Sequence, residues 1–91
     1  MQNDCLIGVD LGTTLAKAGV YDTAGNLLGE AFQETEVRYP RPGVAEQEPA
    51  EFYRSTVATI RGAMERAGVN PARVAALSID SQAGGIMAID R

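Results

Sequence analysis

The stretch Ile7-Gly8-Val9-Asp10-Leu11-Gly12-Thr13-Thr14 decides the fold, because a short apolar run leads directly into a bend that carries a carboxylate, a glycine and two hydroxyls. The apolar residues predict a strand over 5–11 that ends at the bend. Glycine lets backbone N–H groups approach a phosphate closely, and a carboxylate at a strand end can hold Mg²⁺ beside it. These residues fit a phosphate site and a simple hairpin corner equally well, and the bend alone does not decide between them.

The residues after this bend predict an antiparallel meander. Residues 15–22 alternate between apolar and polar side chains, which is typical of a half-buried strand. Ala24-Gly25-Asn26 is a turn signal, and residues 27–35 follow as a third predicted strand. The Gly-Thr-Thr bend is then the first corner of the meander.

A proline-containing segment separates these strands from a predicted helix. Tyr39-Pro40-Arg41-Pro42-Gly43 is expected to be an irregular loop that continues through residues 44–48, because each proline fixes φ and lacks an N–H. Pro49 suits the first position of a helix and Gly68 suits its end, so we predict a helix over 49–67. Its apolar stripe, expected to face the core, is Phe52, Tyr53, Val57, Ile60, Ala63, Met64 and Ala67. The other side is expected to carry mostly Arg54, Ser55, Arg61, Glu65 and Arg66.

The last third of the chain predicts a capped helical turn and two strands. Asn70-Pro71 offers an N-cap and a first-turn proline. Residues 74–79 are apolar enough to predict a strand buried on both faces, and residues 86–90 resume an apolar pattern after a turn. The predicted order is β-β-β-α-β-β.

Composition and charge exclude several classes of function. The net charge is −4 and no basic run is present, so nucleic acid and anionic membranes are poor partners. The absence of histidine removes the usual general base. Cys5 has no partner for an internal disulfide and is expected to be a buried core thiol. No apolar run approaches about 18 residues and the start lacks a basic region, so we interpret the protein as cytoplasmic.

Three blocks of the chain resemble the FGGY family of carbohydrate kinases. Residues 7–14, with Lys17 and the strand ending at 20–22, are similar to the first phosphate motif of that family. Residues 40–49 resemble its P-x-P-G-W-x-E-Q-D-P loop, with Val44 and Glu48 in place of tryptophan and aspartate. Residues 74–82 resemble the strand that leads into its sugar-binding turn. The blocks follow in the family's order across nearly the whole chain.

The resemblance implies an α/β fold, the first of two ribonuclease-H-like domains of the actin/hexokinase/Hsp70 superfamily. Residues 1–91 would be the N-terminal part of domain I, with the remainder of that domain and domain II absent. It implies an ATP-dependent sugar or polyol kinase, xylulokinase-like, that uses ATP and Mg²⁺ and forms a homodimer as the full-length protein. The 91-residue chain alone would be inactive.

The resemblance also implies roles for individual residues. Asp10 would position Mg²⁺, and Lys17 would add positive charge near the transferring phosphoryl group. The residues that would cradle that group are Gly12, Thr13 and Thr14. The residues at the sugar-binding turn are Gln82, Ala83 and Gly84. Glycerol kinases carry Arg-Glu at this turn and xylulokinases carry Met-His. This sequence has neither pair, so the resemblance does not say which sugar is the substrate. No catalytic residue is expected in this segment, because the general-base aspartate of the family lies downstream of Arg91.

Alternatives stand beside these interpretations. A nucleotide-gated protein of the actin/Hsp70 kind shares the Asp-x-Gly-Thr hairpin but lacks the Pro-x-Pro-Gly loop, and an inactive truncated fragment is a third possibility. Lys17 could be a solvated lysine on a hairpin, and residues 82–85 a plain connecting turn. Asp80 is expected to hold a turn. Glu46 and Gln47 are expected to brace their loop, or to line the sugar site.

Overall fold

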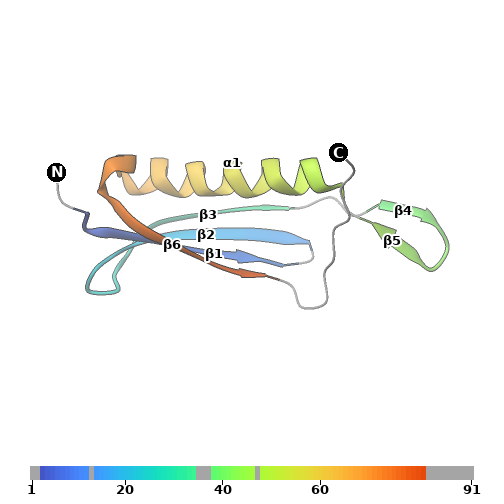
Figure 1. Cartoon of the computed structure of the whole chain (residues 1–91), viewed down its shortest axis with the longest axis horizontal. Helices are drawn as coiled ribbons and strands as arrows, with labels where there is room; N and C mark the ends of the chain where they lie inside the picture. The colour runs from blue at the N-terminus through green and yellow to red at the C-terminus, as the bar shows by residue number, and fades with distance from the viewer. Residues whose placement is uncertain (1–2, 13, 35–37, 47, 82–91) are drawn as a thin grey trace.

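The computed structural model describes residues 3–12, 14–34, 38–46 and 48–81. Its helix α1 lies along one face of a four-stranded sheet, and a two-stranded ribbon projects beyond the end at which α1 begins (Figure 1). The elements, in chain order, are β1 (Cys5–Leu11), β2 (Leu15–Asp22), β3 (Leu27–Glu34), β4 (Arg38–Arg41), β5 (Val44–Glu46), α1 (Pro49–Ala67), the 3₁₀ turn η1 (Pro71–Arg73) and β6 (Val74–Ser81).

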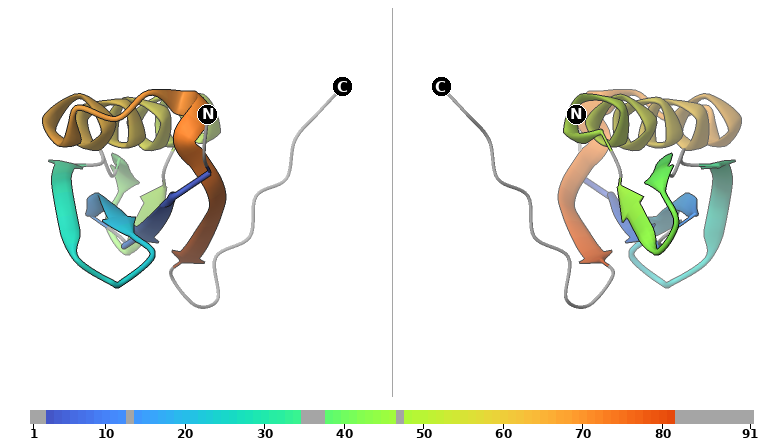
Figure 2. Two further views of the ribbon diagram at one scale, coloured as in Figure 1. Left: turned by 90° about the vertical axis from the view of Figure 1, so that its left-hand side faces the viewer. Right: turned by 90° about the vertical axis from the view of Figure 1, so that its right-hand side faces the viewer.

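The sheet has the order β3-β2-β1-β6, which confirms the predicted antiparallel meander of the first three strands. β1 pairs antiparallel with β2 on one side and parallel with β6 on the other. Figure 2 shows β3 and β6 at the two edges, with β1 and β2 between them and α1 across one face. A mixed sheet with a helix on one face is the α/β architecture expected from the sequence.

The core lies between α1 and the sheet. Alternate residues of β1 and β2 face the helix, as the period-two pattern predicts. Cys5 is fully buried among them, and burial raises the pKa of its thiol, so the prediction of a core cysteine is confirmed. The buried apolar residues are Cys5, Ile7, Val9, Leu11, Ala16, Ala18, Val20, Ala31, Ala63 and Val69.

The helix packs on the core with most of the predicted stripe, and the prediction fails at Tyr53 and Ser55. The residues of α1 that are fully buried are Ser55, Thr59 and Ala63, spaced one turn apart, whereas Tyr53 is 70% exposed. The expected outward position of Ser55 is therefore wrong, and so is the inward position of Tyr53. The helix comes close to β3 at Gly62 and Ala67, which lie against Ala31 and Gly29. The buried Thr59 hydroxyl is satisfied because it donates to the Ser55 carbonyl at 2.6 Å. The larger apolar residues flank this contact, half-buried: Phe52, Ile60, Met64 and Ala67.

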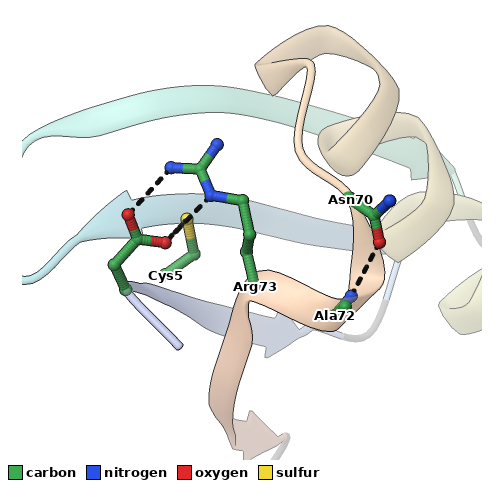
Figure 3. Close-up of polar contacts among 5 residues, drawn as sticks. Cys5, Asn70, Ala72 and Arg73 are labelled. Atoms are coloured by element: carbon green, nitrogen blue, oxygen red, sulfur yellow. Dashed lines mark hydrogen bonds and ion pairs between the residues drawn. The ribbon is translucent and has the colours of Figure 1, made fainter. Parts of the chain in front are cut away.

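The predicted helix end and cap are confirmed. Gly68 has a φ of 66°, its N–H donates to the Glu65 carbonyl, and the N–H of Val69 donates to the Met64 carbonyl, both at 3.1 Å. These two bonds form a Schellman motif, with Val69 buried after it. The Asn70 side chain then accepts from the Ala72 N–H at 2.9 Å and caps η1 (Figure 3).

The segment predicted as an irregular loop contains β4 and β5 instead. Arg38 pairs with Glu46 and Arg41 with Val44, with a register irregularity between the two pairs that accommodates a proline. The turn between the strands is Pro42-Gly43, and Gly43 has a φ of 82°. Proline followed by a left-handed glycine is the signature of a type II turn, which allows the proline-rich segment to pair with itself.

The prediction that residues 74–79 are buried on both faces is wrong. β6 is an edge strand, and Leu77 and Ile79 are 43% and 55% exposed. The cause is the position of α1, which packs on β3 and β2 and reaches β1 only at its margin. The predicted strand over 86–90 lies outside the described residues. Within the described ranges, no helix is long and apolar enough to cross a membrane.

Candidate functional site

The candidate site lies at the end of the sheet where β1 and β6 both finish and where α1 begins (Figure 1). Asp10 of β1 is in register with Lys17 of β2 on one side and with Asp80 of β6 on the other. Paired residues of neighbouring strands project from the same face of a sheet. Val9 and Leu11 are buried under the helix, so the three charged residues share the opposite face.

Asp10 is an exposed residue at the end of β1. Among the described residues, the side chains of Asp10 and Asp80 have no hydrogen-bond or ion-pair partner. Asp22 is different, because its carboxylate accepts from the N–H groups of Ala24 and Asn26 at 3.0 and 2.9 Å and from the Asn26 side chain at 3.0 Å. These bonds, that of the Asn26 side chain first, lower the pKa of Asp22. Asp22 thus stabilises a turn, whereas the carboxylate of Asp10 has no such partner in the part of the chain that the structure describes.

The donor set around Asp10 fits a magnesium ion that also binds phosphate. No group of three or more His, Cys, Asp or Glu side chains able to hold a metal occurs among the residues that the structure describes. Mg²⁺ does not require such a cage, because it commonly binds through one or two carboxylates, waters and substrate phosphates. Asp10 at a strand end, beside a hairpin turn, is suited to that mode of binding.

Gly12 allows the tight turn between β1 and β2. Its N–H donates to the Leu15 carbonyl at 2.9 Å and closes the hairpin. A Cβ at Gly12 would lie 3.1 Å from the same oxygen, so any larger residue would push the strands apart. Because the Gly12 amide is occupied in the hairpin, N–H donors for a phosphate would come from other positions of the bend. Thr14 is exposed there, and Thr13 lies outside the described residues.

Lys17 is half-exposed and forms an ion pair across to β3. Its Nζ lies 3.7 Å from Oε2 of Glu30, although Asp10 is the residue directly opposite it on β1. Glu30 is not among the site residues expected from the sequence. The signal that points to it is strand register: Lys17 pairs with Phe32, so Glu30 and Glu34 are its diagonal neighbours on β3, and the ion pair forms with Glu30.

Several expected site residues are not placed. Gln82, Ala83 and Gly84, together with Gln47, lie outside the described residues. Asp80, expected to hold a turn, is found beside Asp10, and the residues of that turn from 82 onward are likewise undescribed.

The opposite end of the same strand pair is fixed by an ion pair. The Arg73 guanidinium donates from Nε to Oδ1 and from Nη2 to Oδ2 of Asp4, at 2.9 and 3.0 Å (Figure 3). This bond with Arg73 holds the pKa of Asp4 below its ordinary value. Asp4 precedes β1 and Arg73 precedes β6, so the pair fixes the alignment of the strands that carry Asp10 and Asp80.

Comparison with protein families gives one match that covers almost the whole chain. The model of the FGGY family of carbohydrate kinases, N-terminal domain, matches residues 5–91. Among curated proteins, the chain is 34% identical over 91 residues to a glycerol kinase of Paraburkholderia phytofirmans, covering all of this chain and 18% of that protein. The chain therefore spans less than a fifth of the length of this relative.

Solved structures agree on the fold. A xylulose kinase from Rhodospirillum rubrum superposes with a TM-score of 0.77 at 25% identity, over 87% of this chain and 16% of that one. A gluconate kinase from Lactobacillus acidophilus superposes with a TM-score of 0.76 at 26% identity, over 86% and 15%. The expected ribonuclease-H-like α/β fold is confirmed by these neighbours.

Proposed function

Because the chain belongs to the FGGY family of carbohydrate kinases, we propose that it forms the N-terminal part of an ATP-dependent kinase that phosphorylates a sugar or polyol. The γ-phosphoryl group of MgATP would pass to a hydroxyl of the carbohydrate. The observation that carries the proposal is the exposed carboxylate of Asp10 at the end of β1, beside the hairpin turn and in register with Lys17, with no side-chain partner among the described residues.

In this proposal the segment supplies the floor of the phosphate site. Asp10 would hold Mg²⁺, which when bound neutralises charge on the phosphate oxygens. The hydroxyls of Thr13 and Thr14 would donate to the phosphoryl group, and Gly12 would keep the bend tight enough for that approach. Lys17 would place its ammonium where negative charge spreads in the transition state. Positioning and electrostatics supply most of the acceleration in phosphoryl transfer, so these residues need no proton transfer of their own.

The substrate class follows from the relatives, and the individual sugar does not. Their names include glycerol, xylulose and gluconate kinases. We propose a xylulokinase-like enzyme whose sugar-binding turn includes Gln82, Ala83 and Gly84. The small residues at that turn would leave room for a substrate to approach the backbone. The general base would come from the part of the longer relatives that has no counterpart in residues 1–91, so this chain alone is expected to be inactive.

Purified full-length protein tests the proposal. It is incubated with MgATP and a panel of pentuloses, aldonates and polyols, and ADP and the phosphorylated product are measured. We expect ADP release that depends on one carbohydrate of the panel, and no transfer by the 91-residue chain alone. ATP turnover that no carbohydrate stimulates would favour the actin/Hsp70 kind of protein instead.

A further inference from the structure

Lys17 has a carboxylate neighbour on each adjacent strand, and its ammonium group lies toward only one of them. Asp10 is its direct partner on β1, and Glu30 is its diagonal neighbour on β3. The ion pair is formed with Glu30, at 3.7 Å. Within the described residues Lys17 makes no ion pair with Asp10. The positive charge is thus drawn to the β3 side of the site.

The backbone at Glu30 is fixed from the helix side of the sheet. A Cβ at the preceding residue, Gly29, would lie 2.5 Å from the backbone nitrogen of Ala67, so β3 and the end of α1 are in close contact. Nη1 of Arg66 also donates to the Glu30 carbonyl at 3.3 Å. The Glu30 side chain projects from the opposite face of the strand, so it offers Lys17 an anchored partner.

Lys17 can readily exchange its partner Glu30 for another anionic group. Both side chains are over a third exposed, at 49% and 36%, and 3.7 Å is long for an ion pair. Exposed pairs of this kind are weak, so an incoming phosphate can displace the carboxylate at little cost. A triphosphate carries more negative charge than a carboxylate and offers several acceptor oxygens to the ammonium.

We propose that Glu30 is a positioning residue that holds the Lys17 ammonium away from Asp10 and competes with ATP phosphate for it. The inference rests on the proposed function, in which Lys17 meets the phosphate. While Glu30 holds Lys17, the Asp10 carboxylate stays free of its lysine neighbour. When ATP binds, Lys17 leaves Glu30 for the phosphate oxygens.

The test is a double-mutant cycle on full-length protein, with the Kd of MgATP measured by titration calorimetry. Glu30→Gln removes the competitor and is expected to lower the Kd by about two- to fivefold, less at high salt. Lys17→Met is expected to raise the Kd, and adding Glu30→Gln to it is expected to change nothing further. Glu34→Gln is the matched control, because Glu34 lies two pairs along the same face of β3 and makes no ion pair with Lys17.

Each other outcome overturns the inference. If Glu30→Gln leaves the Kd of MgATP unchanged or raises it, Glu30 does not compete with ATP for Lys17. If Glu34→Gln raised the affinity for MgATP equally, the effect would be a general one of charge. The same would follow if Glu30→Gln still raised the affinity in the Lys17→Met background. If Lys17→Met raises the Kd while Glu30→Gln has no effect, the inference fails and the proposed function stands. If Lys17→Met has no effect, the proposed role of Lys17 fails as well.

Discussion

Arg73 and Asp4 form a two-pronged ion pair across the starts of two parallel strands, with N–O distances of 2.9 and 3.0 Å. Asp4 lies immediately before β1 and Arg73 immediately before β6. β1 and β6 hold their pairing from this end through to Leu11 and Ser81, with an irregularity between Cys5 and Leu6. The ion pair is therefore a remote support for the alignment of the strand ends that form the candidate site.

Arg73→Met is expected to weaken the dependence of stability on acid pH. The pKa of Asp4 is held below 3.8 in the folded protein, chiefly by its hydrogen bond with Arg73. The stability that this bond contributes is fully present above about pH 4 and is lost as the pH falls through the lower folded pKa. When urea unfolding is measured at a series of pH values, the free energy of unfolding of the variant should fall less below about pH 4 than that of the original protein. Arg54→Met, which breaks an exposed helix pair with Glu51, should leave the pH profile unchanged.

Gly29→Ala is expected to destabilise the fold by about 1–3 kcal/mol or more. A Cβ there would lie 2.5 Å from the backbone nitrogen and 2.8 Å from the Cα of Ala67, and backbone atoms cannot move aside as a flexible side chain can. Gly8→Ala is the control, since its Cβ would only touch the Tyr21 ring at 3.6 Å. Thermal unfolding of both variants distinguishes them, and equal midpoints would contradict the close contact between β3 and α1.

Gly12→Ala is expected to weaken ATP binding by the full-length protein more than it weakens the fold. The new Cβ would lie 3.1 Å from the Leu15 carbonyl, so the turn has to open by a few tenths of an ångström. The hairpin bond between Gly12 and Leu15 lengthens as a result, while the core below is untouched. Calorimetric titration of MgATP and thermal unfolding measure the two effects. A variant that unfolds earlier but binds ATP normally would show that the bend is only a corner.

Asp10→Ala in the full-length enzyme is expected to lower kcat far more than it raises the KM for the sugar. Its carboxylate makes no bond within the described residues, so the folded state should lose little stability. The loss of kcat reflects the weaker hold on Mg²⁺ beside the transferring phosphoryl group. Steady-state kinetics at several Mg²⁺ concentrations measure this, with unfolding midpoints as the control. Unchanged turnover would remove the proposed role of Asp10.

Local signals in the sequence predicted most of the fold. The strands over β1, β2 and β3 follow from alternation and from turn residues, and α1 follows from Pro49 and Gly68 at its ends. Hydrophobic spacing predicted most of the stripe of α1 that packs on the core, but not the burial of Ser55 and Thr59, whose polar side chains give no hydrophobic signal. The exposure of β6 depends on where α1 lies over the sheet, which is a tertiary relationship. Pro42-Gly43 was a turn signal that outweighed the proline content of its neighbours.

The site was predictable only in part. The residues of the phosphate site could be predicted because a carboxylate, a glycine and two hydroxyls stand together at one bend. The structure places Asp10 and Lys17 opposite each other there. The ion pair of Lys17 with Glu30 depends on the register of a second hairpin, and the position of Asp80 beside Asp10 depends on parallel pairing with β6. Neither relationship is visible in the spacing of residues along the chain.

The parallel pairing of β1 with β6 also sets an order of assembly. The hairpin of β1 and β2 joins neighbouring parts of the chain, whereas Asp4 and Arg73 are 69 positions apart in sequence. Contacts between distant segments form later, because the chain entropy of closing a large loop opposes them. Asp10 and Lys17 are brought together by this local hairpin. Asp80 can join them only after the whole helix has followed.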